Sequence, residues 1–176
     1  MTNSQTPNRL DLSRHLVLFS GGADSTYMIE REQSALHLIH YATNPVKTLA
    51  AEATARRLHR WLTIRRLLEM PACDGEIDEI HALVDTQMVL DAAIVAAHYG
   101  MRGIAVGFNK DDLGIDTGAV TRIMCRAAPN FEILTPLAGM SARKIRKSLD
   151  KNKTHYVTCM VSDPPCGYCP KCVRGY

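Results

Sequence analysis

The sequence predicts an α/β domain with a doubly wound parallel sheet of about five strands. Short apolar runs of strand length alternate with longer stretches in which apolar residues recur at helical spacing. The chain has 176 residues, 46% of them hydrophobic, which is enough for one sizeable core and too little for two ordinary domains. Strands that alternate with helices in a chain of this size favour parallel βαβ units with helices on both faces of the sheet.

Each element follows from its own stretch of sequence. Strands are expected where apolar residues run together, at 15–19, 35–41, 63–68, 103–108 and 131–134. A helix is expected to begin at Asp24 and Ser25, directly after the first strand. Further helices are expected at 45–62, 86–100, 117–128 and 141–149.

The ends of the chain and its charge narrow the class of protein. Residues 1–14 are polar and expected to be loose, and residues 15–176 form one domain that includes a cysteine-rich tail at 155–176. The sequence lacks an apolar leader and a run of about 18 uncharged apolar residues, so we expect a cytoplasmic protein without a membrane partner. The net charge of +3 suits a nucleotide but falls short of the basic stripe that binds duplex nucleic acid.

A loop of small and polar residues follows the first strand, with the sequence Ser20-Gly21-Gly22-Ala23-Asp24-Ser25. Glycines lack a Cβ, so the backbone can turn sharply and bring its N–H groups close to an anion. The helix that follows presents unpaired N–H groups and the positive end of its dipole at the same place. The loop therefore predicts a phosphate cradle, although it has neither the Walker A nor the G-x-G-x-x-G spacing. A glycine turn capped by Asp24 or Ser25 is the alternative.

Four of the six cysteines gather near the end of the chain, at Cys159, Cys166, Cys169 and Cys172. Four thiolates can close a tetrahedral site around Zn²⁺ and leave no open position for water, so we expect a structural zinc site. An iron–sulfur cluster is the alternative, because C-x2-C-x2-C is also a ferredoxin spacing. Cys73 and Cys125 stand alone in the sequence and are expected to be buried thiols.

The 20–25 loop resembles the S-G-G-x-D-S motif of the PP-loop ATP pyrophosphatases, which grip the pyrophosphate of ATP and transfer AMP to a substrate oxygen. The resemblance implies a Rossmann-like sheet of the adenine nucleotide alpha hydrolase type. It also implies that ATP binds with Mg²⁺, which offsets charge on the leaving pyrophosphate. The residues that it places at the nucleotide are Phe19, Ser20, Gly21, Gly22, Ala23, Asp24, Ser25 and Thr26.

Together, the loop and the cysteine tail resemble the 7-cyano-7-deazaguanine synthases of queuosine precursor biosynthesis, over nearly the whole chain. This resemblance implies an ATP-dependent ligase that adenylates the carboxylate of 7-carboxy-7-deazaguanine. Ammonia then displaces AMP to give an amide, and a second ATP-dependent round dehydrates the amide to a nitrile. A homodimeric state is left open.

Charged side chains elsewhere are candidates for the substrate side of the site. Asp111, Asp112 and Asp116 follow the fourth strand and face the expected cleft, where they would bind magnesium or substrate; a solvated acidic loop is the alternative. Lys144 lies in a basic helical run, in which one side chain is expected to contact phosphate although such runs are usually solvated. The candidate catalytic residues are Asp24, Asp112 and Lys144.

The chain also departs from the synthase pattern, which leaves the acceptor open. It has Val84-Asp85-Thr86-Gln87 where the family shows P-G-R-N, and Lys110 stands where an acidic residue is expected before Asp112. One alternative is an enzyme that joins the activated deazapurine to a protein amine, as in relatives within antiviral operons. Another is a non-catalytic, zinc-stabilised module that binds a nucleotide or RNA.

Overall fold

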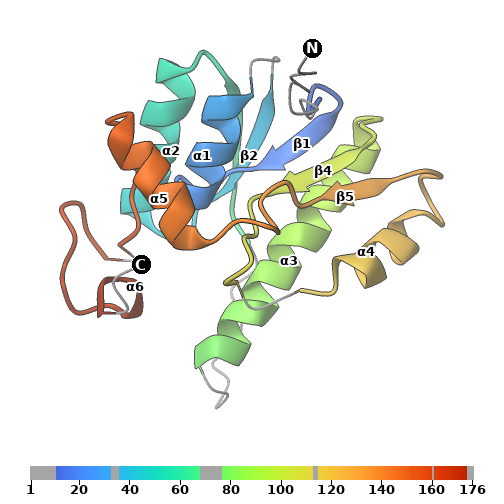
Figure 1. Cartoon of the computed structure of the whole chain (residues 1–176). Coiled ribbons are helices and arrows are strands. Elements are labelled where there is room, and N and C mark those ends of the chain that lie inside the picture. The colour runs from blue at the N-terminus through green and yellow to red at the C-terminus, as the bar shows by residue number, and fades with distance from the viewer. Residues whose placement is uncertain (1–10, 33–35, 68–76, 113–114, 160, 174–176) are drawn as a thin grey trace, which may run out of the picture.

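The structure, a computed structural model, describes residues 11–32, 36–67, 77–112, 115–159 and 161–173 (Figure 1). This part of the chain contains a five-stranded parallel sheet in the order β3-β2-β1-β4-β5. The strands are β1 His15–Leu18, β2 His37–Tyr41, β3 Trp61–Arg65, β4 Gly103–Val106 and β5 Glu132–Leu134. The helices are α1 Ala23–Arg31, α2 Pro45–Arg57, α3 Ile77–His98, α4 Thr117–Met124, α5 Ala142–Lys151 and α6 Pro170–Val173. The predicted doubly wound α/β fold is confirmed.

Two helical layers cover the sheet, with α1, α2 and α5 on one face and α3 and α4 on the other (Figure 1). Successive residues of a strand point to opposite faces, so the central strand β1 contributes to both cores. Val17 lies in the core under α1, α2 and α5, whereas Leu16 lies in the core under α3 and α4. Both side chains are buried, which explains why β1 is apolar from Leu16 to Leu18.

The strand order reverses between β1 and β4. From β1 the chain builds the sheet outward through β2 and β3, and it then returns to the other side of β1 for β4 and β5. The chain leaves β1 into α1 on one face and leaves β4 toward α4 on the other (Figure 1). Doubly wound sheets bind ligands in the crevice between two such loops. The 20–25 loop leaves the sheet at this place.

The predicted helix at 45–62 is too long, and this boundary is corrected by the structure. α2 ends at Arg57, His59 takes the left-handed conformation with φ of 52°, and Trp61 already begins β3. Leu62 continues the apolar spacing of the helix in the sequence, but it pairs with Leu38 of β2 in the sheet. Sheet pairing here overrides a helical pattern that the sequence alone would extend.

Other boundaries move by a few residues. α3 begins at Ile77 and not at residue 86, α4 ends at Met124 and not at residue 128, and the strands are shorter than expected. α6 was not expected, because its residues belong to the predicted turns of the cysteine tail. None of the described helices is long and apolar enough to cross a lipid bilayer.

The described part of the N-terminal segment packs against the domain. Leu12 is 2% exposed and belongs to the core under α1, and its carbonyl accepts the N–H of His15 at 2.9 Å. Residues 1–10 of the segment that the sequence predicts to be loose lie outside the described residues.

Candidate functional site

The backbone of the 20–25 loop is held in place by close packing against α2. Gly21 takes the left-handed conformation with φ of 75°, which L side chains rarely adopt. A Cβ at this position would lie 3.0 Å from the carbonyl oxygen of Lys47 and 3.2 Å from the amide nitrogen of Ala51. Both are backbone atoms of α2, so only glycine fits without a shift of the helix or the loop.

Two serine hydroxyls tie the ends of the loop together. Ser20 Oγ lies 3.0 Å from Ser25 Oγ, and the Ser20 amide donates to Ser25 Oγ at 3.2 Å. Gly22 donates its amide to Ser20 Oγ at 3.2 Å, and Ser25 Oγ also lies within hydrogen-bond distance of the Gly22 carbonyl. The two hydroxyls that the resemblance assigns to phosphate contacts thus also fix the shape of the loop.

The first turn of α1 opens at the end of this loop. Gly22 is the N-cap residue and brings no capping side chain. The first N–H groups of a helix have no partner within the helix, and together with the helix dipole they favour an anion. Asp24 lies in this first turn and is half-buried. Amides and a carboxylate in one turn are a suitable set for phosphate together with a divalent cation.

Phe19 and Thr26 lie beneath the loop. Both residues are buried, with exposed fractions of 1% and 0% for backbone and side chain together. The amide of Phe19 donates to the carbonyl of Ile39 at 2.8 Å and continues the pairing of β1 with β2. These two residues of the predicted nucleotide set therefore support the loop from the core side.

His40 supports the loop from β2, whereas the sequence indicates only an ordinary packing residue in apolar surroundings. Its Nδ1 donates to the Phe19 carbonyl at 2.8 Å, and its Nε2 lies 2.9 Å from Thr48 Oγ1. Burial lowers the pKa of His40, so the ring is neutral near pH 7. A histidine near the end of a buried strand, next to the strand that carries the glycine loop, is the only sequence signal for this contact.

The loop after β4 lies beside the start of α1. A Cβ on Gly107 would lie 3.2 Å from the Ser25 amide nitrogen, so the two backbones are in contact. Two residues later the chain folds back on itself: the Asn109 amide donates to Asp112 Oδ2 at 2.8 Å. Asp112 lies in the loop after β4, and one of its carboxylate oxygens holds this loop in shape. Its catalytic role stays a prediction.

The other two aspartates of the acidic group cap helices. Asp111 Oδ2 accepts the amide of Ala142 at 2.8 Å and so joins the β4 loop to the start of α5. Asp116 is the N-cap residue of α4, and its Oδ1 accepts the amide of Ala119 at 2.8 Å. Lys144 lies in the first turn of α5 and is exposed. The cap by Asp111 therefore brings the helix start that carries Lys144 next to the β4 loop.

The four tail cysteines come together as the sequence predicts. Their Sγ atoms all lie within 4.8 Å of one another, and those of Cys159 and Cys169 are 3.8 Å apart. Cys159 Sγ accepts the backbone amides of Cys166 at 3.4 Å and of Val161 and Ser162 at 3.3 Å each. These hydrogen bonds, that of Cys166 first, lower the pKa of Cys159 to about 5, so its thiolate form is favoured at neutral pH. The cluster is a candidate metal centre.

The tail also touches the loop. The Val157 amide donates to the Gly21 carbonyl at 3.3 Å, two residues before Cys159. A Cβ on Gly22 would lie 3.7 Å from the carbonyl oxygen of Val157. The candidate metal centre is thus connected by two residues of chain to the backbone of the candidate phosphate cradle, a contact that the sequence did not reveal.

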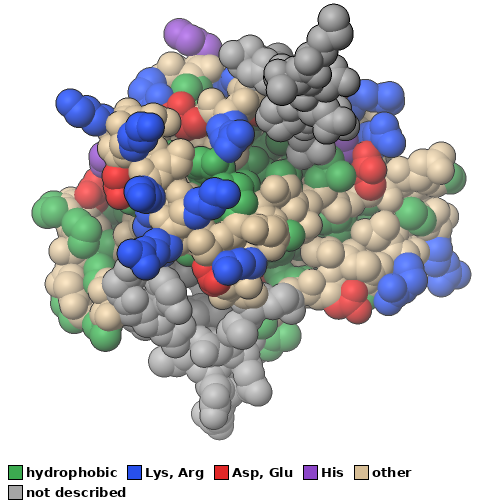
Figure 2. All heavy atoms as spheres, viewed as in Figure 1, with side chains coloured by type: hydrophobic (Ala, Val, Ile, Leu, Met, Phe, Trp, Pro, Cys, Tyr) green, Lys and Arg blue, Asp and Glu red, His purple; other side chains and the backbone are tan. Residues whose placement is uncertain are grey.

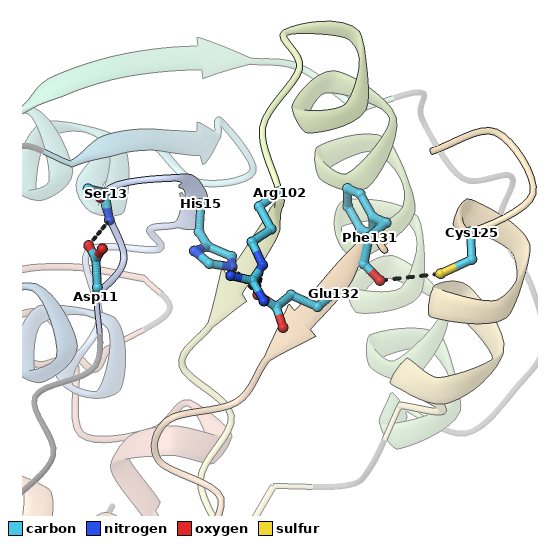
Figure 3. Close-up of polar contacts among 7 residues, drawn as sticks. All are labelled: Asp11, Ser13, His15, Arg102, Cys125, Phe131 and Glu132. Carbon is cyan, nitrogen blue, oxygen red and sulfur yellow. Dashed lines mark hydrogen bonds and ion pairs between the residues drawn. The ribbon is translucent and has the colours of Figure 1, made fainter. Parts of the chain in front are cut away.

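A separate polar cluster lies at the opposite end of the sheet (Figure 3). Oε1 of Glu132 lies 3.1 Å from Nε2 of His15 and 2.7 Å from Nε of Arg102. His15 begins β1 and Glu132 begins β5, so the cluster marks the amino ends of the strands. It joins β1 and β5 across β4 and has no part in the candidate site.

The two lone cysteines take no part in the tail cluster. Cys125 follows α4, is half-buried, and donates its thiol to the carbonyl of Phe131 at 3.3 Å (Figure 3). Cys73 lies outside the described residues.

No protein-family model and no curated protein matches the sequence. Solved structures share the fold. The U34-tRNA thiolase NcsA from Methanococcus maripaludis, a structure with its [4Fe-4S] cluster, matches with a TM-score of 0.59 over 88% of this chain, at 16% identity. A predicted subunit of tRNA methyltransferase from Methanocaldococcus jannaschii matches with a TM-score of 0.50 over 77% of this chain and 73% of its own length, at 23% identity. The chain spans 60% of the length of the thiolase chain. The likeness to both structures supports the α/β fold.

Proposed function

We propose that this protein binds ATP at the 20–25 loop and transfers AMP to an oxygen of an acceptor, with release of pyrophosphate. The observation that carries the proposal is the position of the loop at the switch point of the sheet, with the open first turn of α1 behind it. The S-G-G-x-D-S resemblance adds the chemistry, since that motif is typical of enzymes that cleave ATP between its α- and β-phosphates. Mg²⁺, when bound near Asp24, would offset the charge of the leaving pyrophosphate.

The acceptor that we propose is the carboxylate of 7-carboxy-7-deazaguanine. A carboxylate oxygen attacks the α-phosphorus of ATP, the bond to the pyrophosphate breaks, and a mixed anhydride with AMP results. Ammonia then attacks the carbonyl carbon and AMP leaves, which gives the amide. A second ATP activates the amide oxygen in the same way, and loss of AMP and of both protons of the amide nitrogen gives the nitrile. The paired motifs at the two ends of the chain support this acceptor, because they are those of the deazaguanine synthases.

Acceptor and ATP must meet at the crevice between the loops after β1 and β4. Adenylation needs the attacking oxygen within contact distance of the α-phosphorus, so the acceptor groups must lie beside the cradle. Asp112 and Lys144 are the candidates on this side, and the cap of Asp111 on α5 holds their two segments together. We assign Asp112 to magnesium or acceptor binding and Lys144 to a phosphate.

For the cysteine cluster we propose a single Zn²⁺ that stabilises the tail. Four thiolates at about 2.3 Å from one ion in a tetrahedron lie about 3.8 Å from one another. Cys159 and Cys169 have this separation, and no pair in the cluster exceeds 4.8 Å. In a [4Fe-4S] cluster each thiolate binds a different iron, so the ligand sulfurs must spread farther apart. The spacing in this chain therefore favours one ion.

A base of tRNA is a second candidate acceptor. The observation that favours it is the likeness in fold to a tRNA thiolase and to a predicted subunit of a tRNA methyltransferase. In this case the same cradle would adenylate an oxygen of the base, and a nucleophile would displace AMP. The two acceptors share the first step and differ in what receives AMP.

The test is an incubation of the full chain with ATP, Mg²⁺ and ammonia, with 7-carboxy-7-deazaguanine in one arm and an unmodified tRNA transcript in the other. We expect AMP and pyrophosphate to form with the deazapurine, together with an amide or nitrile detected by mass spectrometry. An amide-linked adduct of the deazapurine on a protein amine, in place of the free amide or nitrile, would instead support the enzyme that uses a protein amine. AMP that forms with tRNA and not with the deazapurine would identify a tRNA base as the acceptor. Cleavage of ATP to ADP in every arm would refute AMP transfer.

A further inference from the structure

The positive charge of the chain is concentrated on one helix. Residues 143–153, which are α5 and the turn after it, contain six Lys or Arg and one Asp, which gives a net charge of +5. The whole chain has a net charge of +3, so the remaining residues together are net negative by two. A charge asymmetry of this kind marks a surface for a polyanion.

These side chains form one exposed surface. Lys144, Lys147, Lys151 and Lys153 are exposed, and Figure 2 shows Lys and Arg side chains gathered over α5 and the neighbouring ends of α1 and α2. A pocket of about 440 Å³ at the end of α5 continues the surface, with Lys153 among the residues that line it. Within the described part of the chain, Lys147 and Lys151 form no ion pair, so their charges are available to a partner.

The opposite side of α5 is apolar and fully used by the fold. Ile145 is 0% exposed and Leu149 is 2% exposed, and both pack in the core with α1 and α2. Membrane-surface helices instead insert an exposed apolar face into the lipid. α5 has no such face to offer, so its basic surface suits a water-soluble polyanion.

The surface runs into the cysteine tail, which carries an exposed aromatic ring. Tyr156 Oη donates to Asp150 Oδ1 of α5 at 2.8 Å, and the Thr154 amide donates to the Leu149 carbonyl at 3.0 Å, so the tail starts against the helix. Farther along, Tyr168 lies between Cys166 and Cys169 and is 71% exposed. An exposed aromatic ring on a compact loop can stack on an unpaired base.

We propose that α5 and the cysteine tail bind RNA, with Lys147 and Lys151 on phosphates and Tyr168 on an unpaired base. Side chains at i and i+4 of a helix are neighbours, so Lys147 and Lys151 can contact two phosphates of one strand. Because the Val157 amide contacts Gly21, RNA held on this surface lies close to the candidate phosphate cradle. The inference rests on the surface alone and holds whether or not the protein transfers AMP.

The test measures binding of a fluorescent, unmodified tRNA transcript to the full chain without ATP, over a series of salt concentrations. In Lys147→Gln/Lys151→Gln two phosphate contacts are lost, so the slope of log affinity against log salt becomes shallower by about 1.4–1.8. That change corresponds to about 30-fold weaker binding near 0.1 M salt. The control is Arg122→Gln/Arg126→Gln, which removes two exposed charges at the same spacing from α4 and the turn after it; Arg122 also lies 3.8 Å from Asp116 Oδ2. It should leave affinity and slope nearly unchanged.

A second variant separates stacking from charge. Tyr168→Ala should weaken binding about tenfold with an unchanged salt slope, since stacking carries no charge. Its zinc content must equal that of the parent, which excludes collapse of the tail as the cause. Equal losses in the α5 and α4 variants, or no binding at low salt, would overturn the proposal. Binding to vesicles of anionic phospholipid that is lost in the α5 variant, without binding to RNA, would overturn it as well and assign the surface to a membrane.

Discussion

Gly21→Ala perturbs the candidate cradle at the residue whose backbone shapes it. Alanine in the left-handed conformation costs about 1–2 kcal/mol. In addition, the new Cβ would lie 3.0 Å from the Lys47 carbonyl oxygen, and ordinary contact begins at 3.4 Å, so the loop and α2 must separate by about 0.4 Å. Overpacking of this kind costs about 1–3 kcal/mol more. The sum is a loss of about 2–5 kcal/mol in the free energy of unfolding, combined with a displaced loop.

Gly100→Ala is the matched control for backbone strain. Gly100 follows α3 with φ of 65°, and a Cβ there would have no atom within 4 Å. This variant should therefore lose only the strain of about 1–2 kcal/mol, which lowers the midpoint of thermal unfolding by about 2–8 °C. Gly21→Ala should lose roughly twice as much.

Nucleotide binding distinguishes the two glycines more sharply than stability does. A displaced loop misaligns amide donors, and each hydrogen bond to a charged group contributes about 1.5–3 kcal/mol, so Gly21→Ala should bind ATP at least about tenfold more weakly. Gly100→Ala should bind ATP as the parent does. The assay is equilibrium binding of ATP below the unfolding midpoint of both variants, with zinc content as a check on the tail. Unchanged ATP affinity in Gly21→Ala would refute the assignment of the cradle.

Three further outcomes are expected. Asp24→Ala should abolish acceptor-dependent release of pyrophosphate while the circular dichroism spectrum stays that of the parent and the unfolding midpoint falls only slightly, because a carboxylate in the first turn of a helix contributes about 0.3–1 kcal/mol; normal turnover would remove Asp24 from the site. Asp112→Asn should lower turnover with zinc content unchanged, whereas Cys169→Ser should lower both zinc content and thermal stability, because binding of a structural metal contributes to folding. Zinc loss in Asp112→Asn, with full zinc content in Cys169→Ser, would contradict both assignments. Bound zinc measured after dialysis should be constant near neutral pH and drop on acidification, because cysteines bind the metal as thiolates and protons compete for them; loss of zinc already at neutral pH would contradict a site of four thiolates.

The sequence predicts those parts of the site whose geometry is set by residues that are close together along the chain. The glycine loop follows directly from a strand and opens a helix, so its place at the carboxyl end of β1 can be read from neighbouring residues. The cysteines are close in sequence, and three of them recur every three residues, so tight turns alone bring most of their thiols together. In both cases the geometry is set within about twenty residues.

The parts that the sequence does not predict depend on contacts between distant segments. His40 reaches the Phe19 carbonyl only because β2 lies beside β1. The contact of Val157 with Gly21 joins the two ends of the chain and has no local signal. The helix predicted at 45–62 is too long for a related reason. Leu62 fits the helical spacing of the sequence, but in the fold it pairs with Leu38 of β2.

The acidic residues after β4 show a different limit of sequence reasoning. Asp116 caps α4 from its N-cap position, a use that short polar side chains at helix starts commonly have, whereas Asp111 accepts an amide of α5 from the loop after β4. Asp112 holds its own loop with one carboxylate oxygen. Composition alone cannot separate a carboxylate that caps a helix from one that binds a ligand.

Attack of an acceptor oxygen on the α-phosphorus of ATP transfers that oxygen to AMP, which an isotope measurement can detect. The full chain is incubated with ATP, Mg²⁺, ammonia and 7-carboxy-7-deazaguanine whose carboxylate is labelled with ¹⁸O, and the AMP formed is analysed by mass spectrometry. We expect AMP that carries one labelled oxygen, because the carboxylate oxygen bonded to the α-phosphorus leaves with it. Unlabelled AMP, or label recovered in inorganic phosphate beside ADP, would show that the carboxylate oxygen does not attack the α-phosphorus.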